Sequence, residues 1–362
     1  MTRQKFARRD FLIASGGVAA TLAASKVRGQ TSQKWAGKTL HVQFWAGPEG
    51  DNLTKNVVEP FEAETGVNVI IDHGVTNESI AKIRAQKDAP QIDLFMMDGV
   101  GVYTTAPQGL LEKLDLSKIP NAKDVDPNFV LMDGMGIGVF TYWTSIIYNS
   151  NHFKEPPKSY EVLWDPAFKG KVAVPPSSDQ GAMQLIVAAA LLAGGNQQNP
   201  DPGFKKLAEL KPNIHSFTTD YSIEAELMRQ GEILLMFDGE MAVKDYIDKG
   251  YPIRLSFEPK EGIFITPDVI SLVKGHPGQT EIAEAFINRA LSIEAQQGLV
   301  KGLGYGPSNR KVDISALSTT DPKLRLYVVP PSLFDKNVLI DPFALAKVRQ
   351  DWIMRYDEAL KG

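Results

Sequence analysis

The chain alternates strand and helix patterns along most of its length, and this alternation restricts its fold more than any other feature. Residues 40–44 read as a strand, and Leu53, Val57 and Phe61 then recur every fourth residue, as on one face of a helix. The run 92–97 is almost continuously apolar, as expected of a strand covered on both faces. Repeated strand–helix–strand units predict an α/β fold with a mostly parallel sheet.

A second alternating region follows, with an expected helix at about 179–192 and a buried strand at 233–237. Two extended segments, 138–149 and 262–273, are rich in β-branched and aromatic residues and read as crossings between the regions. A chain that crosses twice builds two discontinuous lobes that face each other across a cleft. We expect lobe 1 to comprise residues 36–142 and 268–312, and lobe 2 to comprise 143–267 together with 313–362, including C-terminal helices.

The first thirty residues have the layout of an export signal. A basic stretch ends in Arg8-Arg9, and an apolar run of small residues follows at 11–24. The paired arginines favour the twin-arginine route. An N-terminal anchor helix or a chance pair of arginines is the alternative. We expect residues 1–30 to be a twin-arginine-type signal peptide and the mature chain to be periplasmic.

Composition removes several classes of function. The absence of cysteine excludes thiolate metal sites, disulfides and thiol nucleophiles. A formal charge of -4 argues against a nucleic-acid partner. The sequence contains no phosphate-binding loop, and its five histidines lack the spacing of a metal site. We therefore expect no cofactor and no metal.

Several short motifs occur in a set order along the chain: Trp45 with 59–67, 91–94 with Asp98, Tyr148-Asn149, 163–171, 261–264 and 304–309. Their order and spacing resemble those of the periplasmic solute-binding proteins of ABC transporters, in the branch that includes spermidine/putrescine-binding proteins. The resemblance covers roughly residues 38–315. It implies a type II fold of two lobes joined by hinge strands that close on a ligand. It also implies partnership with transporter permease subunits, and we expect a monomer.

Ligands of open α/β sheets bind beyond the carboxyl ends of the strands. We call this the strand-end rule, and it selects candidate residues without reference to a family. It selects positions after the strands of both lobes, at the crossings, and on one glycine-rich loop. The candidate ligand-binding residues are Trp45, Gly47, Asp98, Gly99, Tyr142, Trp143, Ser177, Ser178, Asp238, Glu240, Phe264, Asp268 and Tyr305.

Carboxylates and aromatic rings dominate this set, and it contains no lysine or arginine. Such a set suits an organic ammonium ion, which aromatic faces and carboxylates both attract. We expect a polyamine-like amine, with Trp45 and Trp143 as walls and Asp98, Asp238 and Asp268 as counter-charges. The sequence departs from the polyamine-binding pattern after Phe264, where Ile-Thr-Pro precedes the aspartate.

Alternatives remain at this point. The expected helix start at 177–181 could attract the anionic group of a zwitterion or a small anion, such as a phosphonate or carboxylate. Ser178 could instead only cap the helix, and Asp98 and Asp238 could be turn residues before glycine. A hydrolase would need a triad such as Ser178, Asp179 and His215, but no G-x-S-x-G elbow surrounds the serine. A ferric-iron binder would need adjacent tyrosines, and the sequence has no such pair.

Overall fold

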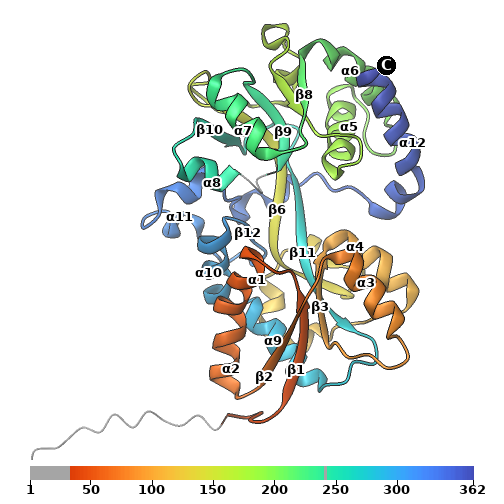
Figure 1. Ribbon diagram of the computed structural model, residues 1–362, viewed down its shortest axis with the longest axis vertical. Helices are drawn as coiled ribbons and strands as arrows, with labels where there is room; N and C mark the ends of the chain where they lie inside the picture. The colour runs from red at the N-terminus through yellow and green to blue at the C-terminus, as the bar shows by residue number, and fades with distance from the viewer. Residues whose placement is uncertain (1–32, 240–242) are drawn as a thin grey trace, which may run out of the picture.

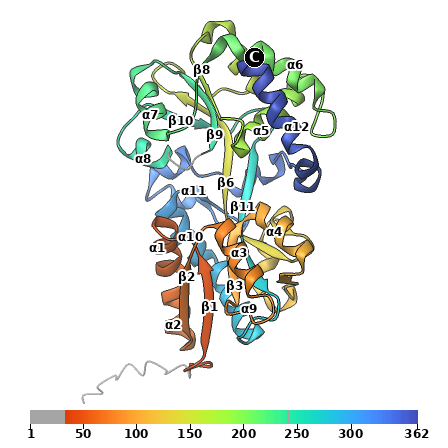
Figure 2. The ribbon, with the colours of Figure 1, turned by 45° about the vertical axis from the view of Figure 1, so that its right-hand side comes forward.

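The computed structural model describes residues 33–239 and 243–362. The expected signal peptide and the candidate Glu240 therefore lie outside the described residues. The described chain forms two lobes stacked along its longest axis, and two long strands run between them (Figures 1 and 2). The expected α/β architecture of two lobes joined by hinge strands is confirmed.

Lobe 1 is built on a parallel core in which β1 pairs with both β2 and β3. Alternate residues of β3 enter two different apolar clusters, because Leu94 and Met96 pack in one while Phe95 and Met97 pack in the other. The predicted strand at 92–97 is therefore covered on both faces, as expected. The elements of lobe 1 are β1 (Thr39–Phe44), α1 (Pro48–Leu53), a π-helical turn (Thr54–Val58), α2 (Glu59–Thr65), β2 (Asn68–His73), α3 (Thr76–Ala85), β3 (Leu94–Asp98), α4 (Gly99–Thr105), β4 (Leu111–Glu112), β5 (Val130–Leu131), α9 (Thr280–Ala290) and α10 (Ile293–Leu303).

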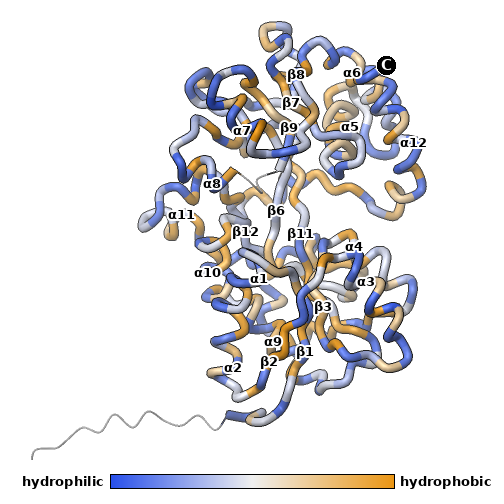
Figure 3. The backbone as a smooth tube through the Cα atoms, in the orientation of Figure 1, coloured by the Kyte–Doolittle hydropathy of each residue, from blue (hydrophilic) through white to orange (hydrophobic). Residues whose placement is uncertain are grey.

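Lobe 2 repeats this plan with a shorter sheet, in which β7 pairs in parallel with β8 and β9. The predicted helix at 179–192 is α5, and its residues 181–190 are all buried. Both α5 and β3 stand out as hydrophobic segments (Figure 3). The elements of lobe 2 are β7 (Val172–Val174), α5 (Gln180–Leu192), α6 (Asp201–Leu210), β8 (Ile214–Phe217), α7 (Tyr221–Gln230), β9 (Leu235–Gly239), α8 (Val243–Asp248), β10 (Ile253–Ser256) and α12 (Pro342–Lys361).

The two predicted crossings are the long strands β6 (Gly136–Asn149) and β11 (Phe264–Val273), which pair with each other in antiparallel fashion. On the lobe 1 side β11 also pairs with β3, and on the lobe 2 side β6 pairs with β9 and β10. One sheet therefore continues through both lobes, in the order β2-β1-β3-β11-β6-β9-β7-β8. The carboxyl ends of β1, β3 and β9 point toward the junction (Figure 1), and β7 runs parallel to β9.

The chain passes from lobe 1 back to lobe 2 once more after β11, as the expected bounds 268–312 and 313–362 imply. Segment 313–336, expected in lobe 2, contains α11 (Ile314–Leu317) and packs in an apolar cluster that holds residues of both lobes. Asn337 then ties the chain to β11, because its side chain accepts from the Ile265 N–H at 2.8 Å and donates to the Ile265 carbonyl at 3.0 Å. We therefore propose that lobe 2 resumes near Val338, after this anchor.

No helix within 33–239 and 243–362 has the length and hydrophobicity needed to cross a membrane.

We predict that Asn337→Ala lowers the free energy of unfolding by about 2 kcal/mol, because two hydrogen bonds to the β11 backbone are lost at about 1 kcal/mol each. Urea denaturation of the ligand-free protein measures this change. Asn151→Ala, at an exposed position, is the matched control and should change stability by less than about 0.5 kcal/mol. Equal effects of the two substitutions would contradict the anchoring role of Asn337.

Candidate ligand-binding site

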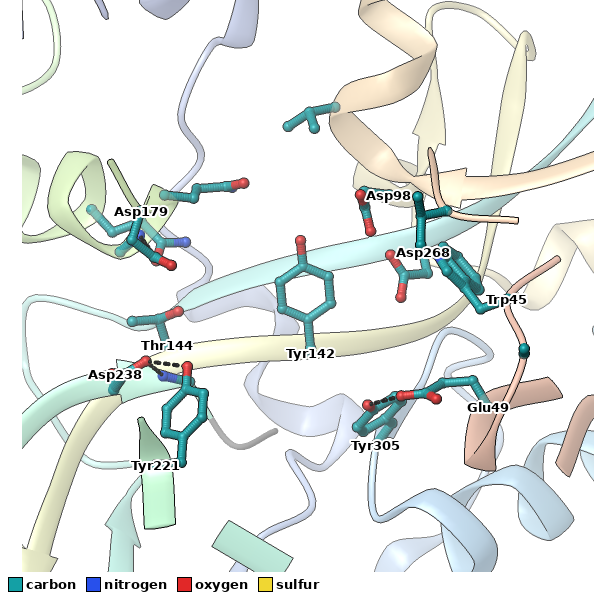
Figure 4. Close-up of a pocket in the computed structure, with 17 residues that line it drawn as sticks. Trp45, Glu49, Asp98, Tyr142, Thr144, Asp179, Tyr221, Asp238, Asp268 and Tyr305 are labelled. Carbon is teal, nitrogen blue, oxygen red and sulfur yellow. Dashed lines mark hydrogen bonds between the residues drawn. The ribbon is translucent and has the colours of Figure 1, made fainter. Parts of the chain in front are cut away.

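A cavity of about 500 Å³ lies between the lobes, in front of the hinge strands (Figure 4). This volume is in the range of sites that hold small molecules. Residues from both lobes and from both hinge strands contribute to its walls. The lining residues are Trp45, Ala46, Glu49, Val75, Asp98, Val100, Tyr142, Thr144, Asp179, Gln180, Gly181, Gln184, Tyr221, Asp238, Gly239, Asp268 and Tyr305.

Six residues selected from the sequence come together in this cavity, although they are spread over 260 positions of the chain. Each comes from a strand end, a hinge strand or the loop after α10, which is where the strand-end rule places ligands. These six are Trp45, Asp98, Tyr142, Asp238, Asp268 and Tyr305.

Trp143, expected as a wall of the cavity, lies instead in the core. Its side chain is fully buried, its ring packs 4.7 Å from that of Phe257, and its Nε1 donates to the Tyr327 carbonyl at 3.3 Å. Successive side chains of a strand point to opposite faces. Since Tyr142 faces the cavity, Trp143 has to face away from it.

Phe264 and the two glycines also lie outside the cavity lining. Phe264 is buried between Tyr160 and Phe237, with ring centroids 6.3 and 6.1 Å away. Gly99 opens α4, and a Cβ there would meet the Pro267 carbonyl oxygen at 2.6 Å. Gly47 precedes α1 with a φ of 75°, a left-handed conformation that favours glycine.

The two serines before α5 do not reach the cavity either. Ser177 is buried and hydrogen-bonded to Asp357. Ser178 is exposed, and its carbonyl accepts from Arg349 at 3.2 Å. The residue that caps α5 is Asp179, whose Oδ1 accepts from the Gly181 N–H at 2.6 Å. The capping role considered for Ser178 therefore belongs to its neighbour.

Several residues that line the cavity were not predicted from the sequence. Some of them nevertheless satisfy the strand rules that selected the other candidates. Thr144 lies two residues after Tyr142 and so shares its strand face. Tyr221 follows the end of β8, where the strand-end rule was not applied. Glu49 lies in the first turn of the helix after Trp45, and its Oε1 accepts from the Tyr305 hydroxyl at 2.8 Å. That pair joins positions 256 residues apart, which no local pattern reveals.

The cavity has five carboxylates on its walls, from Glu49, Asp98, Asp179, Asp238 and Asp268, and no lysine, arginine or histidine from the described part of the chain. Two of these acids face each other at the lobe 1 end, since Asp98 and Asp268 are register partners of β3 and β11. Side chains in such positions start about 5 Å apart, and like charges there repel. Asp268 also lies at an irregularity of the β11–β6 pairing, a feature that re-aims side chains.

At the lobe 2 end, Asp238 is 6% exposed. Its Oδ1 accepts from the Tyr221 hydroxyl at 3.0 Å and from the Gly239 N–H at 2.7 Å. Burial raises the pKa of Asp238 to about 7, and the negative charge of Asp179 adds to the rise, while these hydrogen bonds oppose it. An uncompensated buried carboxylate of this kind favours a neighbouring cation.

The described residues contain no cluster of three or more histidine, cysteine or acidic residues arranged to hold a metal ion. His215, considered for a catalytic triad, contacts the Gly170 carbonyl at 3.2 Å through Nδ1. The arrangement as a whole is suited to binding a positively charged molecule between acidic and aromatic groups.

We predict that Asp238 makes ligand-free stability depend on pH. In the folded protein the Asp238 carboxyl keeps its proton up to about pH 7, whereas an aspartate in the unfolded chain loses its proton near pH 4. The folded state therefore binds more protons in this window, and its stability falls as the pH rises through it. Asp238→Asn removes the titration. The free energy of unfolding of Asp238→Asn minus that of the wild type should therefore rise by about 2–3 kcal/mol from pH 5 to pH 8.

Urea denaturation at the two pH values measures this difference, and Asp351→Asn on the exposed side of α12 serves as the control carboxylate. If the difference in unfolding free energy between wild type and Asp238→Asn is the same at both pH values, the prediction is contradicted.

Comparison with known proteins supports the fold and shows the family. The profile described as bacterial extracellular solute-binding protein matches residues 56–325. A spermidine/putrescine-binding periplasmic protein 1 of Haemophilus influenzae is 26% identical over 315 residues, covering 82% of this chain and 84% of the relative.

Two solved structures share the fold over nearly their whole length. An ABC transporter structure from Clostridium perfringens has a TM-score of 0.76 and 26% identity, covering 89% of this chain and 99% of the other. The Atu4243–GABA receptor has a TM-score of 0.69 and 26% identity, covering 89% and 98%. With its two lobes and interlobe cavity, the chain thus belongs to the family of bacterial extracellular solute-binding proteins, which are substrate-binding proteins of transporters and not enzymes.

Proposed function

We propose that the chain captures a small organic amine in the interlobe cavity and delivers it to the permease subunits of an ABC uptake transporter. The observation that carries this proposal is the charge of the lining: five carboxylates and no basic side chain from the described residues. Two of these acids, Asp238 and Asp268, are buried, and a buried carboxylate is costly unless a cation compensates it. A ligand with at least one ammonium group supplies that cation.

The aromatic part of the lining suits the same ligand. Trp45, Tyr142, Tyr221 and Tyr305 contribute rings to the cavity walls. A cation over an aromatic face gains about 0.5–2 kcal/mol, and hydrogen bonds from ammonium to carboxylate are about twice as strong as neutral ones. The name of the Haemophilus relative, which refers to spermidine and putrescine, supports an amine ligand.

The zwitterion alternative has two supporting findings. One is the likeness to a GABA receptor, and the other is the 26% identity over 276 residues to a putative 2-aminoethylphosphonate-binding periplasmic protein of Salmonella typhimurium. The geometry at α5 weighs against it. Asp179 already occupies the helix start, where its carboxylate accepts from the Gly181 N–H, so an incoming anion would meet a negative charge there. The amine is therefore the better-supported ligand, and zwitterions belong in the test as competitors.

We predict that amines, but not anions, raise the melting temperature of the purified chain. Ligand at about 100 times its Kd adds about 2.7 kcal/mol to stability. Asp98→Asn should weaken amine binding by about 10- to 100-fold, because one charge-assisted hydrogen bond is lost. A thermal-shift screen followed by titration calorimetry measures both effects, with Asp351→Asn on α12 as the control outside the cavity. A shift with phosphonates or carboxylates and none with amines would contradict the proposal.

We further propose that the twin-arginine route exports the chain to the periplasm. The proposal rests on Arg8-Arg9 followed by the apolar run at 11–24. Replacing both arginines with lysine preserves the charge, so a charge-only signal would survive the change. We predict that the double variant accumulates in the cytoplasm, as measured by cell fractionation and immunoblotting. Export at the wild-type level would contradict this route.

A further inference from the structure

We propose that a separate cavity, which is lined by α11 and lies behind the hinge strand β6, binds a small carboxylate with an apolar body. This α11 cavity has a volume of about 310 Å³, at the lower end of the range for small-molecule sites. Helix α11 lies on the opposite side of the lobe junction from α12 (Figure 1). The inference does not depend on what binds in the interlobe cavity.

Most of the lining of the α11 cavity is apolar. Ile314 of α11 and Val328 contribute to it, and both belong to the packed interior, with 5% and 1% of their surfaces exposed. Phe257, which follows β10, adds a half-buried aromatic ring. An apolar group that enters such a cavity gains about fourfold in affinity for each methylene group that it buries. The α11 cavity therefore favours a ligand with a hydrocarbon body.

Arg325 gives the α11 cavity a positive charge, and no acidic residue of the described chain lines it. Arg325 is exposed, and no ion pair between described residues involves it. Nearby basic residues differ in this respect. Lys323 pairs with Asp248 at 3.1 Å, and Arg310 pairs with Asp335 at 2.8 Å. Since a guanidinium group binds a carboxylate through two parallel hydrogen bonds, the charge of Arg325 favours a ligand with a carboxylate at one end.

The polar groups of the two cavities select different ligands. The interlobe cavity has five carboxylates on its walls, whereas the α11 cavity has one arginine and two serines as its charged and hydroxyl-bearing residues. The Ser318 hydroxyl already donates to the Ile314 carbonyl at 2.7 Å. Ser315 is exposed, so its hydroxyl can donate to a ligand carboxylate beside Arg325. An ammonium ion, which suits the interlobe cavity, would be repelled by Arg325 in the α11 cavity.

The α11 cavity lies against the reverse face of the hinge strand. The ring of Phe257 is 4.7 Å from that of Trp143 on β6, and Trp143 Nε1 donates to the Tyr327 carbonyl at 3.3 Å. The strand neighbours of Trp143, which are Tyr142 and Thr144, line the interlobe cavity on the other face. A molecule bound against Phe257 is therefore separated from the hinge strand by one aromatic ring, and the fluorescence of Trp143 should report its binding.

Titration calorimetry with linear carboxylates from acetate to octanoate tests the site. We expect one molecule to bind per chain, with affinity rising about fourfold for each added methylene group until the cavity is full. Acetate, which lacks an apolar body, should not bind measurably, in agreement with the absence of a thermal shift expected for small hydrophilic anions. 1-Hexanol should bind about tenfold more weakly than hexanoate, because it lacks the charge that pairs with Arg325. Equal affinity for hexanol and hexanoate would contradict the role of Arg325.

Two variants locate the bound carboxylate. Arg325→Gln removes the charge and should weaken hexanoate binding about tenfold while leaving hexanol binding unchanged. Ser315→Phe places a ring in the cavity and should abolish the binding of both. Lys347→Gln, at an exposed position of α12, is the control and should bind hexanoate like the wild type. Since Arg325 and Ser315 are exposed, we expect both variants to fold, and their melting temperatures check this. Unchanged hexanoate affinity in either variant would overturn the inference.

Two further measurements separate the α11 cavity from the interlobe cavity. Hexanoate should change the tryptophan fluorescence of the wild type, and most of this change should be absent in Trp143→Phe. Equal changes in both proteins would place hexanoate elsewhere and contradict the inference. Saturating putrescine should leave hexanoate bound, whereas competitive displacement would place both in one cavity and also contradict it. If no carboxylate binds, the inference is wrong while the proposed amine function stands, and a failure of amine binding leaves the carboxylate site intact.

Discussion

The antiparallel pairing of β6 with β11 is the constraint on which the rest of the structure depends. These two strands pass through both lobes, and each also pairs with the parallel strands of one lobe. Their main-chain hydrogen bonds therefore set where the carboxyl ends of β3 and β9 lie. Asp98 and Asp238, which follow those ends, consequently face one cavity from opposite lobes. The same strands supply Tyr142 and Asp268, so the hinge forms the floor of the site as well as the connection between lobes.

Electrostatics then determine what this cavity can hold. Natural proteins bury carboxylates together only where something compensates them, and the described lining offers no basic side chain. The energetic cost is visible at Asp238, where burial raises the pKa to about 7. A cationic ligand makes the electrostatic contribution of these carboxylates favourable, because it replaces repulsion between acids with attraction to the ligand. Acidic residues in both lobes would also favour closure around such a ligand, since each lobe then gains contact with the same charge.

Much of the fold and part of the site could be predicted from local sequence patterns. The strand-end rule found Trp45, Asp98 and Asp238 because it needs only the position where a strand stops. It failed at Trp143 because it does not say which face of a hinge strand meets the ligand, and a shift of one residue moves a side chain to the other face. It failed at Ser177 and Ser178 because the helix start lies one residue later, at the cap Asp179.

The sequence by itself determined the alternation of strands and helices, the two long crossing segments and an excess of acids near strand ends, because all of these are local patterns. Only the tertiary structure decided that Glu49 and Tyr305 meet, that residues 313–336 pack in a cluster shared by both lobes, and that the acids divide into two groups on either side of Tyr142. The reason is that such contacts join residues far apart in the chain, and their partners follow from strand register and lobe packing, which no single segment encodes.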